Sequence, residues 1–85
     1  MGYPMRTEER VRLLRDVGHD VSMSCCIVTL NERLDHRIRK VTFRLRHDEH
    51  IYEQVVVLGL HEGNPAVERA MHQAIDAVLA SAKLP

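Results

Sequence analysis

Five basic residues lie close together near the middle of the chain: Arg37, Arg39, Lys40, Arg44 and Arg46. On a β-strand, Lys40, Arg44 and Arg46 would share one face, because side chains separated by an even number of positions point the same way. A cationic stripe of this kind can bind RNA phosphates. The alternative is a solvated face, with Arg44 opposite Glu53 in a cross-strand ion pair. We favour the solvated face, because no exposed aromatic side chain is interleaved with the stripe to stack bases.

Histidines and carboxylates form a second candidate for chemistry, a metal site. His47 and His50 flank Asp48 and Glu49 in a short polar segment, and His61 follows further along the chain. Imidazole and carboxylate groups are common metal ligands. However, His61 lies at the far end of an extended strand, roughly 35 Å from His50. We therefore expect a polar turn at residues 47–50, and neither a metal nor a cofactor.

The two cysteines, Cys25 and Cys26, are the only thiols. Adjacent strand residues point to opposite faces, so these two cannot bridge each other. Their neighbours are Met23, Ile27 and Val28, and we expect two reduced, buried cysteines, because burial raises the pKa of a thiol and makes it inert. No Ser-His-Asp set, acidic dyad or dinucleotide loop is visible, so we do not expect an enzyme.

The elements that carry these residues follow from the spacing of apolar side chains. Thr7 is predicted to cap a first helix that stops at Gly18, and strands are predicted at 21–30, 38–46 and 51–60. Asn64 and Pro65 then begin a last helix. Its apolar stripe consists of Val67, Met71, Ala74, Ile75, Val78 and Ala82. Its outward residues are expected to be Glu68, Arg69, His72, Gln73 and Asp76.

The predicted fold class is therefore α+β, in the order α-β-β-β-α. A three-stranded antiparallel meander forms the sheet, and the C-terminal helix packs on one face of it. Residues 6–85 are expected to form a single domain. Residues 1–5 are expected to be disordered or not native to the protein.

This order, with the segment Gln73-Ala74-Ile75-Asp76 followed by Ala77-Val78-Leu79, resembles the ribosome hibernation-promoting factors. The order alone also resembles the double-stranded-RNA-binding domain. Both resemblances imply contact with RNA or the ribosome. The chain departs from the first family because no N-terminal strand fits before the first helix. It departs from the second because Ala66-Val67-Glu68-Arg69 replaces the lysine pair that opens its last helix.

Composition and strand pattern together point to a protein partner. The formal net charge is zero, which does not favour a nucleic-acid binder, and apolar residues make up 45% of the chain. No signal peptide or membrane span is visible, so we expect a cytoplasmic protein. Strands 21–30 and 51–60 carry apolar residues on both faces, so something must cover the second face or the edge. A second copy would do this by stacking sheets or by joining edges.

The hypothesis that explains this pattern best is a small, non-catalytic protein-interaction module that forms a homodimer and binds another protein. An RNA- or ribosome-binding module is the alternative. A third possibility is that helices cover opposite faces of the sheet and complete the monomer.

Overall fold

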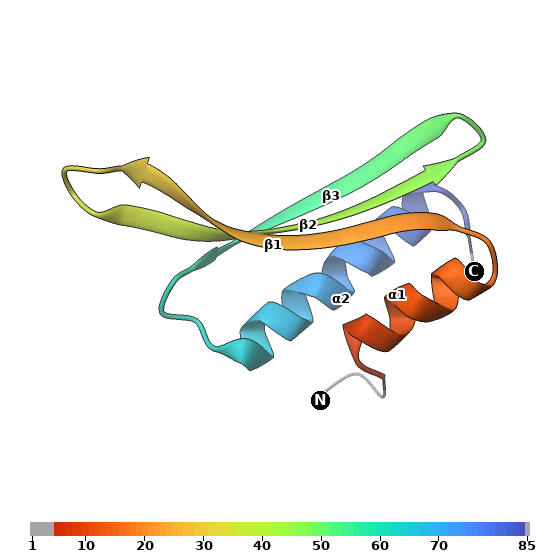
Figure 1. Cartoon of the computed structure of the whole chain (residues 1–85), viewed down its shortest axis with the longest axis horizontal. Helices are drawn as coiled ribbons and strands as arrows, with labels where there is room; N and C mark the ends of the chain where they lie inside the picture. The colour runs from red at the N-terminus through yellow and green to blue at the C-terminus, as the bar shows by residue number, and fades with distance from the viewer. Residues whose placement is uncertain (1–4, 85) are drawn as a thin grey trace.

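The computed structural model describes residues 5–84, which form two helices and one sheet (Figure 1). In chain order the elements are α1 (Thr7–Asp16), β1 (Asp20–Asn31), β2 (His36–His47), β3 (His50–Gly59) and α2 (Asn64–Ser81). The strands pair antiparallel in the order β1-β2-β3. The predicted α+β fold and its meander are confirmed. The prediction for residues 1–5 lies, apart from Met5, outside the described residues.

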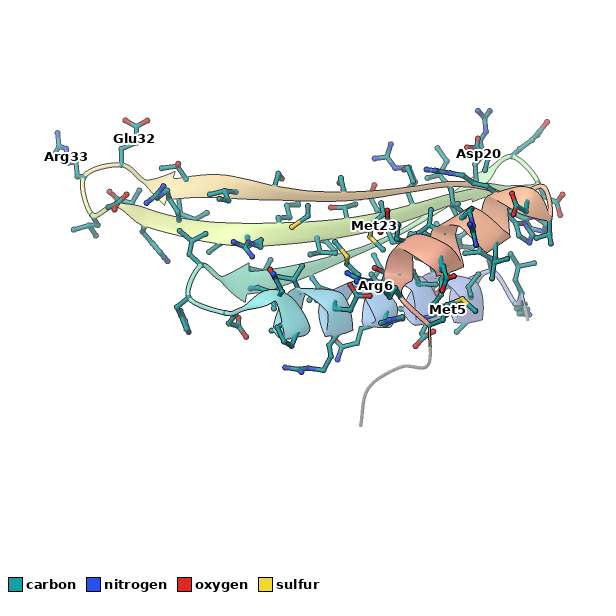
Figure 2. All side chains as sticks on the ribbon, turned by 60° about the horizontal axis from the view of Figure 1, so that its bottom comes forward. Met5, Arg6, Asp20, Met23, Glu32 and Arg33 are labelled. Carbon is teal, nitrogen blue, oxygen red and sulfur yellow. The ribbon has the colours of Figure 1, made fainter. Side chains whose placement is uncertain are left out.

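Both helices lie on the same face of the sheet, which we call the helix-side face (Figures 1 and 2). Helix α2 packs against β2 and β3, and α1 packs against β1 and touches α2. Within residues 5–84 no element covers the opposite face, which we call the uncovered face. The possibility that the helices take opposite faces and complete the monomer is therefore wrong.

The core lies between α2 and the central strand. Strict alternation in β2 sends Val41, Phe43 and Leu45 to the helix-side face, where all three are fully buried. Ile75 and Val78 of α2 pack in one cluster with Phe43 and Leu45, as the apolar stripe predicts. Burying each of these side chains contributes about 1.5–3 kcal/mol, so this cluster is the main source of stability.

The helix boundaries differ slightly from those predicted. Helix α1 has Arg6 at its N-cap, and Thr7 is already its first residue. Gly18, with φ of +98°, turns the chain out of α1 as expected of a glycine stop. Helix α2 has Gly63 at its N-cap rather than Asn64, and Pro65 stands in its first turn, where a missing N–H costs nothing.

The β1–β2 hairpin extends beyond the helices and makes the molecule elongated, with extents of 45 × 32 × 18 Å. We call its end, residues 27–39, the arm (Figure 1). Pairing between β2 and β3 begins at Ile38, so the arm beyond that residue has only two strands. Glu32 and Arg33 lie at its tip, far from both helices (Figure 2). The connection is shorter than the predicted 31–37, because both strands continue further.

Candidate interaction surface

The uncovered face of the sheet has an apolar half and a charged half. Residues opposite each other in the register share a face, so Val28 lies beside Ile38, and Ser22 lies in line with Arg44 and Glu53. The mainly apolar half, nearer the arm, contains Val28, Ile38, Val55 and Val57, with Lys40 beside Val57. The mainly charged half, at the other end, contains Asp20, Arg44, Arg46 and Glu53, with the exposed Ile51 beside Arg46.

The structure does not bring the five predicted basic residues onto one surface. Lys40, Arg44 and Arg46 do share the uncovered face, as their spacing predicts. Arg37 and Arg39 sit at odd positions of β2 and point to the helix-side face instead. The candidate RNA surface therefore keeps three of its five members.

Acidic side chains compensate part of this basic charge. The guanidinium of Arg44 donates to Glu53 Oε2 over 2.6 Å from Nη2 and 2.8 Å from Nε, which confirms the predicted cross-strand pair. Arg46 lies opposite Asp20 in the register. On the helix-side face, Arg37 pairs with Asp35 at 3.1 Å. The result is a face of mixed sign rather than a continuous cationic stripe.

Cys25 and Cys26 are both free and both exposed, so the prediction that they are buried is wrong. Cys26 points to the uncovered face. Cys25 points to the helix-side face, opposite Val41, but α1 does not reach far enough to cover it. A helix of ten residues is about 15 Å long, whereas a strand of twelve residues is about 40 Å long. The short length of the first helix, compared with the strand that follows it, was the feature of the sequence that indicated this exposure.

The histidines behave as the sequence predicts at the β2–β3 turn. His47 pairs with His50 in the register, and His47 Nε2 lies 3.4 Å from Asp48 Oδ2. His61 lies past the other end of β3. In the part of the chain that the structure describes, no three His, Cys, Asp or Glu side chains are grouped to hold a metal ion.

Polar contacts that the sequence did not predict join the two helices. We call this cluster, made of Thr7 and Arg10 of α1 with Glu68, His72 and Asp76 of α2, the clasp. Arg6, the N-cap of α1, provides no side-chain cap, and Glu68 of α2 provides one instead. Its Oε1 accepts from the Thr7 backbone N–H at 2.8 Å, and its Oε2 accepts from the Thr7 hydroxyl at 3.2 Å. A carboxylate at a helix N-terminus also interacts favourably with the helix dipole. Glu68 therefore fixes where α1 begins.

His72 is the second member of this clasp, and it was expected to face outward. The residue is only 1% exposed, and its Nδ1 lies 3.0 Å from Arg10 Nη1. Arg10 also donates to Asp76 Oδ1 at 2.7 Å. Burial and the nearby Arg10 charge lower the pKa of His72 below its ordinary value of 6.5, against the opposing effects of Glu68 and Asp76. The spacing of residues 68, 72 and 76, four apart beside the apolar stripe, was a signal for this shared face.

The outer edge of β1 is the least protected border of the sheet. No other described strand pairs with it, and the eleven residues from Val21 to Asn31 include no charge, glycine or proline. Natural edges are usually guarded by such residues. At the start of this edge, however, one backbone group is already occupied: Arg15 donates from Nη2 and Nε to the Val21 carbonyl at 3.1 and 3.3 Å.

A groove of about 410 Å³ opens beside this edge on the helix-side face. It lies between the start of α1, the first half of β1 and α2. Its apolar side chains are Val11, Met23 and Met71, and the charged side chains of Arg6, Glu8 and Glu68 also line it. Figure 2 shows Met23 on the stretch of β1 close to the start of α1, near Arg6. Met23 therefore brings β1, the edge strand, to the border of the groove.

Comparison with known proteins identifies no relative: no family model, no curated protein and no solved structure matches the chain. The resemblance to the hibernation factors and to the double-stranded-RNA-binding domain therefore stays a prediction. Among residues 5–84, no helix is long and apolar enough to cross a membrane.

Proposed function

We propose that this chain is a small, non-catalytic protein-interaction module that associates with a second copy of itself. The observation that carries this proposal is the arm, where apolar side chains remain exposed because neither helix lies beneath them. Ile27 and Leu30 are each 55% exposed, and Leu34 is 76% exposed. Val57, on the uncovered face next to the arm, is 56% exposed.

A second copy is the partner that these surfaces favour. Exposed apolar side chains gathered in one region of a small protein mark an interaction surface, whereas isolated ones do not. A two-fold dimer is the commonest assembly of identical chains. The formal net charge is zero, so two copies do not repel each other through their net charge. Two exposed, unpaired cysteines also fit a reducing compartment, so we place the module in the cytoplasm.

Sedimentation velocity tests self-association directly. We expect the weight-average mass to rise from that of one chain to that of two between about 1 and 100 μM, a range that corresponds to ordinary dimer affinities. The buffer contains a reductant, so that no disulfide contributes. A species that stays at the mass of one chain over this whole range contradicts the proposal.

Binding of RNA or the ribosome is a second candidate, because Lys40, Arg44 and Arg46 share the uncovered face. It predicts an affinity for RNA that falls steeply as salt rises. It also predicts that the double variant Arg44→Glu/Arg46→Glu loses this affinity. The control variant Arg69→Glu/Lys83→Glu changes the net charge equally but lies in and just after α2, and it should still bind. Equal binding by both variants excludes the uncovered face as an RNA surface.

A further inference from the structure

We propose that two copies associate by pairing their β1 edges antiparallel, so that the two three-stranded sheets join into one sheet of six strands. This inference rests on the proposed self-association and specifies its geometry. The two-fold axis passes through the centre of the free edge, at Cys25 or at Cys26.

The usable part of the edge is bounded by two features of β1. At its start, the Val21 carbonyl already accepts hydrogen bonds from the Arg15 guanidinium. At its end, the register with β2 shifts between Thr29 and Asn31, and such an irregularity bends a strand and interrupts pairing. The part of the edge that is regular and free to pair with another strand is therefore residues 22–29. It contains no charged side chain that would be desolvated when a second strand approaches.

Symmetry then selects the central residue. A two-fold axis that relates neighbouring antiparallel strands stands perpendicular to the sheet, so one residue must lie opposite its own copy. The midpoint of residues 22–29 falls between Cys25 and Cys26. Maximal overlap is therefore reached with Cys25 opposite Cys25 of the second copy, or with Cys26 opposite Cys26 of the second copy. In either register, both pairs of helices lie on the same side of the six-stranded sheet.

The two ends of β1 complement each other in this arrangement. Helix α1 covers the start of the strand, where Val21 is buried, and leaves its end bare, where Ile27 is exposed. Antiparallel pairing places the bare end of one copy beside the covered end of the other. With Cys25 at the centre, Ile27 lies opposite the second copy's Met23, a wall of the groove beneath α1. With Cys26 at the centre, Thr29 takes that place. A second copy thus brings both a pairing strand and a side chain, Ile27 or Thr29, that lies beside Met23 at the border of the groove.

Disulfide trapping tests this geometry, because directly opposite residues of antiparallel strands have Cα atoms about 4.5–5.5 Å apart. That spacing lies within the range of a disulfide, about 4.4–6.8 Å. The chain, reduced and freed of reductant, is treated briefly with diamide. Two thiols lose two protons and two electrons to one diamide, which becomes a hydrazine, and one S–S bond forms. The wild type, Cys25→Ser and Cys26→Ser are compared on a non-reducing gel, each also in urea.

We expect the wild type and one of the two serine variants to give the covalent dimer, and the other variant to give at least about tenfold less. Loss in Cys25→Ser assigns the axis to Cys25, and loss in Cys26→Ser assigns it to Cys26. Equal trapping by both variants, or trapping that persists in urea, indicates random collision and overturns the edge geometry. A dimer in sedimentation that no diamide treatment can trap also overturns the edge geometry but leaves self-association intact. A strict monomer overturns both proposals.

Discussion

The β1–β2 hairpin has one half beneath the helices and one half in the arm, and its side chains differ in exposure between the two. Beneath the helices, alternate side chains such as Val21, Phe43 and Leu45 are 5% exposed or less. In the arm, residues of comparable size on the same β1–β2 hairpin, Ile27 and Leu30, are more than half exposed. Both halves use apolar side chains, and they differ in whether a helix covers them. Strand length and helix length are therefore mismatched in this fold, and the mismatch creates the surface that a partner can use.

This comparison separates two uses of an apolar side chain. In the covered half, the side chain contributes to the stability of the single chain, because burial removes it from water during folding. In the arm, it contributes little to folding and is available for association. Substitutions in the two halves should therefore affect different measurements.

Truncation of a core leucine should have the largest effect. Leu45 is fully buried, so Leu45→Ala should lower the free energy of unfolding by about 2–5 kcal/mol through lost burial and a cavity. Leu34, at 76% exposure in the arm, undergoes the same chemical change in Leu34→Ala and should cost less than about 0.5 kcal/mol. Urea denaturation of both variants measures the difference. Similar losses would show that the arm is buried in the folded unit.

A charge on the β1 edge should have the next largest effect, on association rather than on folding. Ile27→Glu places a carboxylate opposite Arg39 within the monomer, so the fold should tolerate it. It should weaken dimerisation at least about tenfold, or about 1.4 kcal/mol, because the charge is desolvated at the joined edge. Sedimentation velocity at several concentrations measures this.

Val57→Glu is the matched control for this change. Val57 is as exposed as Ile27, and its neighbour on β2 is the basic residue Lys40, but it lies on β3 and on the uncovered face. Association through the β1 edge should leave Val57→Glu dimeric. If Val57→Glu dissociates while Ile27→Glu does not, the copies stack through their uncovered faces instead.

The clasp between the helices gives a smaller effect in the covered half. Glu68→Gln removes the charge that caps α1 but keeps the side-chain size, and we expect a loss of about 1 kcal/mol in the free energy of unfolding. Glu8→Gln, an exposed change within α1, is the control and should cost less. Chemical denaturation measures both variants. An equal effect would mean that Glu68 does not hold the start of α1.

Much of this architecture follows from the sequence, because local patterns determine it. The alternation of Val41, Phe43 and Leu45 predicts both the central strand and its buried face. The pairing of Arg44 with Glu53 follows from the short turn at residues 47–50, which sets the register of the β2–β3 hairpin. These features depend only on neighbours along the chain or across one turn.

What could not be predicted depends on how far one element reaches over another. The spacing of apolar residues in α1 does not determine which face of the sheet this helix covers. The exposure of Cys25 depends on where α1 lies. His72 was expected to be solvated because histidine on a helix flank usually is. Its burial requires Arg10 and Asp76 to meet around it, which only the contact between α1 and α2 brings about. The sequence predicts that a second copy stacks on the sheet or joins an edge, but it does not say which edge is open, because that depends on the strand order and on where the helices lie.

The smallest expected effect is the pH dependence of this helix contact. The folded protein holds the pKa of His72 below 6.5, so the unfolded chain binds more protons as pH falls through this range. The contribution of neutral His72 is therefore complete above pH 6.5 and is lost as pH falls through its lowered folded pKa. His72→Gln should be less stable than the wild type at pH 7.5, and this difference should shrink at pH 5.5. Arg10, Glu68 and Asp76, the charged groups that act on His72, all remain in this variant.

The control for this profile is His61→Gln, an exposed histidine after β3, which should leave the pH profile of the wild type unchanged. Urea denaturation at both pH values measures all three proteins. A difference between His72→Gln and the wild type that stays constant with pH would show that His72 contributes by packing alone. A smaller difference at low pH would show instead that α1 is held to α2 through an uncharged imidazole, so that acid weakens the covered half while the arm is unaffected.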